Sequence, residues 1–267
     1  MKTTIITLIT DFGLSDEYVG VMKGVILSRC PTAVIVDITH QVRPQDIRQA
    51  ALLLAATHRF FPVGTIHVVV VDPGVGTSRR IVLIEVAGQF FLLPDNGACS
   101  LLPAPQAAWA VTEERLFLQP MSRTFHGRDI FAPVAAALAG GLPAACTGPA
   151  IDPADLTRLA LPPLHIEANE LCGAVIDIDH FGNLITNIDR AGATSFSRGG
   201  LDRLTVTVGS QTIPTISPTY ASNKIGEAVA LFGSRDLLEI GINRGNAAAR
   251  LGIDLDTAVR VRRPAQS

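Results

Sequence analysis

The sequence has few of the features that assign a chain quickly to a class of protein. Its 22 basic and 24 acidic residues are scattered without a long run of either sign, which argues against a nucleic-acid scaffold or a polybasic membrane binder. Its apolar runs, such as residues 50–57, are too short to span a bilayer. The apolar N-terminal stretch suits a first strand better than a signal peptide, because no small-residue cleavage site is obvious. We therefore expect neither a nucleic-acid partner nor a membrane partner.

Cysteine and the familiar ligand-binding motifs are also sparse. Cys30, Cys99, Cys146 and Cys172 show no CxxC spacing, and we interpret them as reduced core residues of a cytoplasmic protein. There is no GxGxxG after the first predicted strand, no GxxxxGK[ST], no HExxH and no GxSxG. A dinucleotide fingerprint, a P-loop, a zinc-protease motif and a generic α/β hydrolase are therefore not supported. We expect no metal and no cofactor.

The most informative stretch that is present runs from Val68 to Arg80, VVVVDPGVGTSRR. Four consecutive valines predict a strand buried on both faces, as in a parallel sheet covered by helices. The strand stops at Asp72, and Gly74 and Gly76 permit backbone conformations that other residues resist. Ligands bind at the carboxyl ends of strands in open α/β sheets, and Arg79 follows within reach. A strand-end turn with a solvated acid and surface arginines explains this stretch equally well.

The first half of the chain alternates strands and helices, which predicts an α/β domain with a mostly parallel sheet. A helix is expected after the first strand, with Ser15 or Asp16 as its cap and Pro31 as its stop. Strands are predicted over residues 4–10, 33–38 (as a buried strand) and 68–71, a hairpin-like pair over 80–86 and 89–93, and further helices over 46–61 and 130–139.

The second half of the chain has a different pattern, with short predicted strands and no predicted helices. A proline-rich interval between Gly148 and Pro163 suggests a boundary near residue 160, which gives domains of residues 1–160 and 161–267. Short strands separated by Gly, Asn and Asp turns then predict a smaller all-β domain, either a barrel-like fold or a sandwich. The predicted strands cover residues 171–178, 183–188, 204–208, 213–216, 228–232 and 237–242.

Polar residues gather at the ends of several predicted strands, but each has a simple structural explanation. Asp11 could favour a helix N-terminus through its charge, and His126 could be a helix cap. Asp179 and Asn183 could be turn formers. No single one of these residues identifies a site.

The combination of segments is more specific than any one of them. Together they resemble the S-adenosyl-L-methionine (SAM) hydroxide adenosyltransferases, which are SAM hydrolases related to the fluorinating and chlorinating enzymes. The resemblance runs from about residue 5 to about residue 251, nearly the whole chain. The segments occur in this order: ITDFG from Ile9, VDPGVGTSRR from Val71, PDNG from Pro94, TFHGRDIFAP from Thr124, IDHFGNLITNI from Ile178 and GINRGNAA from Gly241.

This resemblance implies an N-terminal α/β domain, a C-terminal barrel-like domain and assembly as a homotrimer. It implies that SAM lies between the N-terminal domain of one subunit and the C-terminal domain of the next. An Asp, Arg and His set, which falls on Asp72, Arg79 and His126, would deliver water or hydroxide to the C5′ carbon. The sequence leaves open which of Asp72 and His126 takes the proton.

The resemblance also implies which residues bind the substrate. The ribose-binding aspartate falls on Asp11. Many relatives differ at Arg235, and His180 stands where relatives commonly have Arg. The residues expected to contact the methionine end and adenine are Asp179, Phe181, Asn183, Ser234 and Arg235.

Three other functions remain open at this point. The first is a SAM-dependent 5′-halogenase, although that branch carries an aromatic residue where this chain has Asp72. The second is a nucleosidase that would release adenine. The third is a non-catalytic SAM-binding module, against which the complete set of Asp72, Arg79 and His126 argues.

Overall fold

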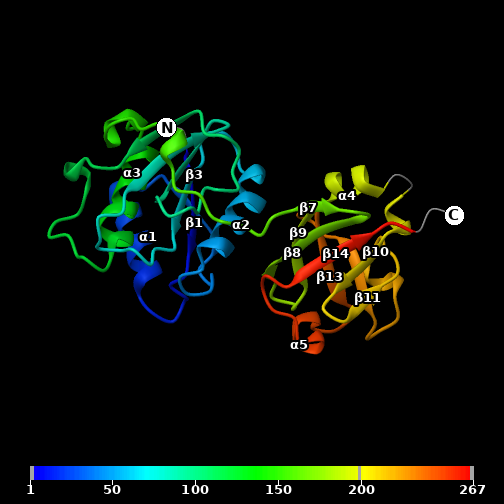
Figure 1. The fold of residues 1–267 in the computed structure, drawn as a ribbon. Coiled ribbons are helices and arrows are strands. Elements are labelled where there is room, and N and C mark those ends of the chain that lie inside the picture. The colour runs from blue at the N-terminus through cyan, green and yellow to red at the C-terminus, as the bar shows by residue number, and fades with distance from the viewer. Residues whose placement is uncertain (1–2, 198–199, 265–267) are drawn as a thin grey trace. The chain divides into compact units, whose positions relative to one another are not determined.

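The computed structural model describes residues 3–197 and 200–264. The chain divides into two compact units, Met1–Leu159 and Ala160–Ser267, coloured blue to green and green to red in Figure 1. The first unit combines helices with a sheet, and the second is built mainly from strands. The predicted fold class, an α/β domain followed by a smaller barrel-like β domain, is confirmed.

The sheet of the first unit has six strands in the order β2-β1-β3-β5-β4-β6. The pairs β2–β1, β1–β3 and β3–β5 are parallel, whereas β5–β4 and β4–β6 are antiparallel. The predicted hairpin is therefore confirmed as β4–β5. The strands are β1 (Ile5–Thr10), β2 (Val34–Thr39), β3 (Ile66–Val70), β4 (Ile81–Val86), β5 (Gln89–Pro94) and β6 (Ala107–Ala110).

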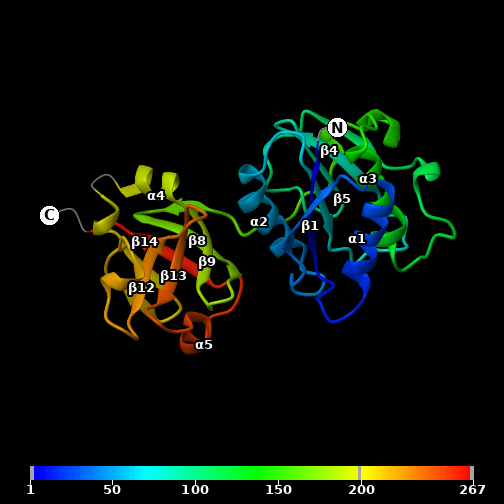
Figure 2. The ribbon, with the colours of Figure 1, turned by 180° about the vertical axis from the view of Figure 1, so that it is seen from behind.

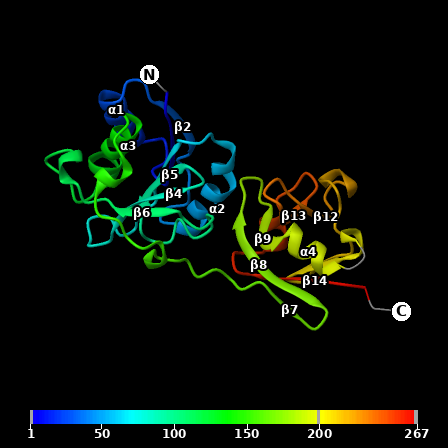
Figure 3. The same cartoon turned by 90° about the horizontal axis from the view of Figure 1, so that it is seen from above.

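Helices pack against both faces of this sheet (Figure 3). The valine run shows why, because its side chains alternate between two apolar clusters. Val68 and Val70 pack with residues of α1 and α3, whereas Val69 and Val71 pack with residues of α2. All four are buried, as the continuous apolar run predicts. The helices are α1 (Tyr18–Arg29), α2 (Ile47–Thr57) and α3 (Ala132–Ala139).

Two local predictions in this unit are wrong. The strand predicted over residues 33–38 is β2, an edge strand whose side chains are exposed or half-buried, with Val34 45% exposed. An edge position leaves one side of a strand without a neighbour, so apolar composition alone overstated its burial. The residue before α1 is Glu17, not Ser15 or Asp16, and its side chain makes no capping bond.

The second unit contains an eight-stranded antiparallel sheet (Figure 2). Its order is β11-β10-β14-β8-β9-β13-β12, with β7 paired to β8. A bridge joins Ile216, which follows β11, to Ala230 of β12 at the other end of the sheet, so the sheet nearly closes into a barrel. Its strands are β7 (His165–Glu167), β8 (Glu170–Ile178), β9 (Leu184–Asp189), β10 (Thr205–Val208), β11 (Gln211–Ile213), β12 (Ala228–Phe232), β13 (Leu237–Ile242) and β14 (Ala258–Arg262).

Some short elements were not predicted. They include β7, β14 and two helices, α4 (Arg190–Ser197) and α5 (Ala247–Leu251). Their apolar patterns are too short to separate from turns. Short 3₁₀ turns complete the chain at η1 (His58–Phe60), η2 (Glu114–Leu116), η4 (Ala144–Thr147), η5 (Pro153–Asp155), η6 (Leu201–Arg203) and η7 (Tyr220–Ser222).

The cysteines are free, but they are not all core residues. Cys30 and Cys99 are buried, Cys172 is half-buried and Cys146 is exposed. The core interpretation is therefore wrong for Cys146 and only partly right for Cys172. In the part of the chain that the structure describes, no helix combines the length and the apolar character needed to cross a bilayer.

Candidate active site

A charged cluster lies just past the carboxyl end of β3. The Arg79 Nε donates to both carboxylate oxygens of Asp72, at 3.0 and 2.8 Å, and Arg79 Nη2 also donates to Asp72 Oδ2. The same Nη2 lies 2.8 Å from the Nδ1 of His126. One guanidinium therefore holds a carboxylate and an imidazole together, from residues far apart in the sequence.

Two glycines shape the loop that carries Asp72 and Arg79. Gly76 has a φ of +77°, and a Cβ there would lie 2.3 Å from the carbonyl oxygen of Arg123. Gly74 acts differently, because its φ is not positive, but a Cβ there would lie 3.2 Å from Arg79 Cγ. Gly76 therefore permits the turn, and Gly74 leaves room for Arg79 to fold back onto Asp72.

His126 stands at the start of a π-helical turn, η3 (Gly127–Phe131), which continues directly into α3. The helix thus begins three residues earlier than the predicted start at residue 130. Such turns occur frequently at functional sites. The preceding residue, Phe125, is packed in place: its ring lies 6.0 Å from that of Phe12 and 5.0 Å from that of Tyr18, both edge-on.

The surroundings of His126 favour its neutral form. Burial lowers the pKa of His126, and the Arg79 charge lowers it further, against opposing effects from Asp72 and Asp129. Because an arginine N–H can only donate, the Nδ1 that faces it must be the accepting nitrogen. The proton of the neutral imidazole is therefore on Nε2, and His126 can offer a donor rather than an acceptor to a ligand on that side.

Asp72 and His126 face a small cavity of about 240 Å³. Asp11 and Phe12 from the end of β1 also line it, together with Gln45 and Thr124. Arg79 does not line this cavity, although it bonds to two residues that do. The cavity is smaller than the roughly 300–1,000 Å³ typical of ligand pockets.

Asp11 is not at a helix N-terminus, since α1 begins only at Tyr18. Its Oδ2 accepts a hydrogen bond from the backbone N–H of Gln45 at 2.8 Å, and Gln45 has a positive φ of 65°. This strained residue lies between two anchored neighbours, Arg43 and Asp46. The structure therefore holds Asp11 in place at the cavity.

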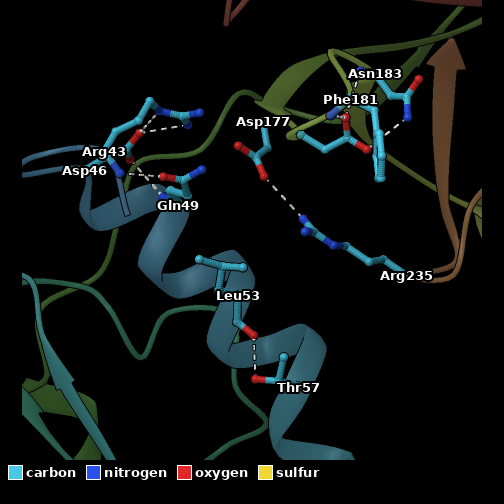
Figure 4. A network of polar contacts seen from close by, with 10 residues as sticks. Arg43, Asp46, Gln49, Leu53, Thr57, Asp177, Phe181, Asn183 and Arg235 are labelled. Carbon is cyan, nitrogen blue, oxygen red and sulfur yellow. Dashed lines mark hydrogen bonds and ion pairs between the residues drawn. The ribbon is translucent and has the colours of Figure 1, made fainter. Parts of the chain in front are cut away.

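The anchoring comes from a network at the start of α2 (Figure 4). The Oδ1 of Asp46 accepts from the N–H of Gln49 at 2.8 Å, which caps the helix. The Oδ2 of Asp46 accepts from Arg43 Nε at 2.9 Å, and Gln49 Oε1 accepts from the Arg43 N–H at 2.8 Å. The prediction that Asp46 lies near the start of this helix is confirmed.

Arg80 takes no part in the cluster. Its guanidinium pairs with Asp95 and donates to the carbonyl of Asp155 at 2.7 Å. The two adjacent arginines therefore differ in role, because alternate residues of an extended segment point to opposite sides.

The second unit has a larger cavity of about 730 Å³. Asp179, Phe181, Asn183 and Ser234 all line it, as the resemblance implies. Asp179 Oδ1 accepts from the N–H groups of Phe181 and Asn183, and its Oδ2 accepts from Asn183 Nδ2, at 2.8–2.9 Å. Asp179 is thus a turn former and a cavity residue at once. The turn leaves Phe181 73% exposed.

Arg235 does not line this cavity. Its Nη1 donates to Oδ2 of Asp177 at 3.2 Å, and Asp177 is almost fully buried (Figure 4). A buried carboxylate is costly without a counter-charge. Arg235 therefore has a structural partner that accounts for its charge.

Three polar or charged side chains of this cavity were missed by sequence reasoning. Tyr220 lies with its hydroxyl 3.3 Å from Asn183 Nδ2, and Arg244 follows β13. Glu239 lies within β13 and is only 8% exposed. Burial, and then the nearby charge of Asp179, raise the pKa of Glu239 to about 7. One signal was available: Glu239 is an acidic residue in an otherwise apolar strand, LLEIGI.

One group of side chains could hold a metal ion among the described residues. The ligand atoms of His165, Glu167 and Cys172 lie within 4.8 Å of one another on β7 and β8. None of the three lines either cavity described above. The expectation that the candidate active site uses no metal stays a prediction.

The fold and the site define a class of two-domain protein. An α/β unit carries a hydrogen-bonded Asp–Arg–His cluster, and a barrel-like unit with an acidic cavity follows it. Family models assign both units to one family. The model of the SAM hydroxide adenosyltransferase N-terminal domain matches residues 6–148, and the model of the C-terminal domain matches residues 173–260. The chain belongs to the SAM hydroxide adenosyltransferase family.

Relatives of known name agree with this assignment. The chain is 39% identical to an (R)-S-adenosyl-L-methionine hydrolase of Thermus thermophilus, over 95% of this chain and 97% of that one. It is 29% identical to a fluorinase of Nocardia brasiliensis, over 98% and 97%. A crystal structure of an uncharacterized conserved protein from Thermotoga maritima superposes with a TM-score of 0.90 at 34% identity, covering 97% of this chain and all of that one.

Proposed function

We infer that this chain is a SAM hydrolase that forms adenosine and L-methionine by in-line attack of water on C5′. Membership of the family and the similarity to named hydrolases support the activity. The observation that carries the mechanism is the cluster in which Arg79 holds Asp72 and His126 together beside a cavity.

The chemistry needs help at the nucleophile more than at the leaving group. Methionine leaves as a neutral thioether from a sulfonium, so no acid is required to expel it. Water is a weak nucleophile and must lie in line with the C5′–S bond. Holding it there can contribute roughly 7–11 kcal/mol in well-oriented cases. Attack forms the O–C5′ bond, and the C5′–S electron pair goes to sulfur.

We assign the proton to Asp72. The Nδ1 of His126 is occupied by Arg79, so its Nε2–H can donate to the water oxygen and orient a lone pair toward C5′. The remaining acceptor is the Asp72 carboxylate, which can take the proton as the O–C5′ bond forms. Such general-base help is typically worth about 10²–10⁴-fold. Arg79 acts through these two groups and is a positioning residue.

The substrate is proposed to bind through both units. Asp11 would accept hydrogen bonds from the ribose hydroxyls, and the second-unit residues would contact the methionine end and adenine. We propose a homotrimer in which each ligand is shared between neighbouring subunits, as the resemblance implies. The small first-unit cavity supports sharing, because it is below the usual size for a ligand of this kind. The second-unit residues in this proposal are Asp179, Phe181, Asn183 and Ser234.

A 5′-halogenase is the second candidate, because fluorinases are among the relatives. The position of Asp72 disfavours it, since a carboxylate at the cavity repels a halide nucleophile. A nucleosidase and a non-catalytic binder remain as outcomes of the test. A cytoplasmic location also stays a prediction, based on the scattered cysteines.

The test is a chromatographic time course with SAM, with and without chloride. We expect adenosine and methionine in equal amounts, no effect of halide, and turnover that is slower by about 10²–10⁴-fold in Asp72→Asn. A 5′-halogenated nucleoside would assign the chain to the halogenase branch. Adenine would indicate a nucleosidase, and binding without products would indicate a binding module.

A further inference from the structure

Glu239 is a buried carboxylate with no counter-charge among the residues that the structure describes. It comes from β13, is 8% exposed and faces the 730 Å³ cavity of the second unit. Among the described residues its carboxylate has neither an ion pair nor a hydrogen bond. Buried carboxylates are normally paired or hydrogen-bonded. A missing partner at a cavity wall therefore points to a partner that arrives with the ligand.

The groups around Glu239 make the cavity wall acidic. Asp179, from the turn between β8 and β9, lies near enough to raise the pKa of Glu239. Tyr220 and Asn183 are neutral, and Arg244 lines the same cavity without pairing to Glu239. His180 adjoins Asp179 in sequence but does not line the cavity.

The backbone makes space for this carboxylate. A Cβ on Gly233 would lie 2.1 Å from Glu239 Oε2. Any other residue at that position would displace the carboxylate, so the side chain and the turn after β12 fit each other. This close fit holds Glu239 at the cavity wall next to Ser234, which lines the same cavity.

We propose that Glu239, together with Asp179, is the counter-charge for the cationic end of the substrate, and that binding of this cation expels a proton from Glu239. This inference rests on the proposed function, because SAM carries two organic cations, its ammonium and its sulfonium. A nearby positive charge favours the carboxylate form. The pKa of about 7 means that the free protein holds this proton about half of the time near neutral pH.

The experiment is isothermal titration calorimetry at pH 7 in two buffers with different ionisation enthalpies. The difference in heat gives the number of protons released on binding. The Asp72→Asn background slows turnover, so that little SAM is consumed during the titration. We expect SAM to release about half a proton, and Glu239→Gln in the same background to release almost none and to bind SAM at least tenfold more weakly. Glu227→Gln, at an exposed carboxylate before β12, is the matched control and should behave like its parent.

Four ligands separate the two sources of positive charge. SAM has both cations, S-adenosylhomocysteine has only the ammonium, 5′-dimethylsulfonio-5′-deoxyadenosine has only the sulfonium, and 5′-methylthioadenosine has neither. If, of these two compounds, only S-adenosylhomocysteine releases a proton, Glu239 is assigned to the ammonium. If only the dimethylsulfonium compound does, Glu239 is assigned to the sulfonium. The neutral nucleoside should release none, and equal release with all four ligands would overturn the proposal.

A second measurement does not depend on any change at Glu239. The Kd for SAM should rise by up to about tenfold per pH unit as the pH falls from 7 toward 5.5, because each binding event must then release a whole proton. A Kd that stays flat over this range, or proton release unchanged in Glu239→Gln, contradicts the role of Glu239 while leaving the hydrolase intact. Failure to form adenosine from SAM would instead contradict the proposed function.

Discussion

The two cavities differ in whether their carboxylates are paired with a cation of the protein. In the first unit the Asp72 carboxylate is neutralised inside the protein by Arg79, which also fixes His126. In the second unit Glu239 and Asp179 face a cavity, and no cation within the described part of the chain is paired with Glu239. A self-contained cluster can be oriented before the ligand arrives, as catalysis requires. An unpaired carboxylate in a cavity wall carries a desolvation cost. A bound cation offsets this cost, which favours cationic ligands over neutral ones.

The largest expected effect comes from Asp72→Asn, which keeps the shape of the side chain but removes the proposed proton acceptor. We expect kcat to fall by about 10²–10⁴-fold, while the Kd for SAM changes little. Single-turnover kinetics together with equilibrium binding separate these two quantities. A kcat within a factor of three of the unmodified chain would show that Asp72 is not the acceptor.

Changes at His126 should distinguish a donor from an acceptor. His126→Gln retains an N–H donor of similar reach, so we expect it to lose less kcat than His126→Glu, which offers only an acceptor. Because burial and Arg79 lower the pKa of His126, its active neutral form should persist below pH 6.5. The kcat should therefore fall only as the pH drops further, through that lowered pKa. A fall in kcat that is centred at or above pH 6.5 contradicts the neutral-donor role.

Asp11→Ala should act on binding more than on chemistry. Loss of a charge-assisted contact to the ribose costs about 1.5–3 kcal/mol, which corresponds to roughly 10–150-fold in Kd. We expect kcat at saturation to fall by less, provided that the water remains in place. The comparison with a 2′,3′-dideoxy analogue of SAM is the control: the mutation should weaken binding of SAM but not binding of the analogue. Equal weakening of both ligands would make Asp11 a structural residue.

The smallest expected effect concerns stability. The pKa of Glu239 is about 7 in the folded chain, compared with an ordinary value of 4.5. The folded state therefore binds its proton more tightly than the unfolded state, so the ionised side chain destabilises the protein increasingly between pH 4.5 and 7. We expect Glu239→Gln to raise the free energy of unfolding by about 1–3 kcal/mol at pH 8. Near pH 4 the two chains should be equally stable in urea titrations, and a stability gain that is the same at both pH values would contradict the raised pKa.

The sequence predicted well what depends on local pattern. The valine run, the β4–β5 pair and most strands of the second unit follow from apolar periodicity and turn residues. It predicted less well what depends on neighbours. The exposure of β2 follows from its place at the sheet edge, which its own residues do not encode. The pairing of Arg235 with Asp177 joins positions 58 residues apart.

The candidate site shows the same division. The resemblance places Asp72, Arg79 and His126 in one group, and the structure brings these three side chains together. The resemblance does not indicate that Arg79 is absent from the cavity lining or that Arg79 fixes the tautomer of His126. Glu239 belongs to none of the quoted segments. Only the three-dimensional arrangement reveals that this lone acid of β13 faces the same cavity as Asp179.

The most direct test of the account is the fate of solvent oxygen. When SAM is turned over in H₂¹⁸O, attack of water on C5′ predicts one ¹⁸O atom in the 5′-hydroxyl of adenosine and none in methionine, as read by mass spectrometry. Asp72→Asn should slow the appearance of this label without redirecting it. Label on a ribose released from adenine, or on homoserine formed beside methylthioadenosine, would show attack at another carbon and contradict the account.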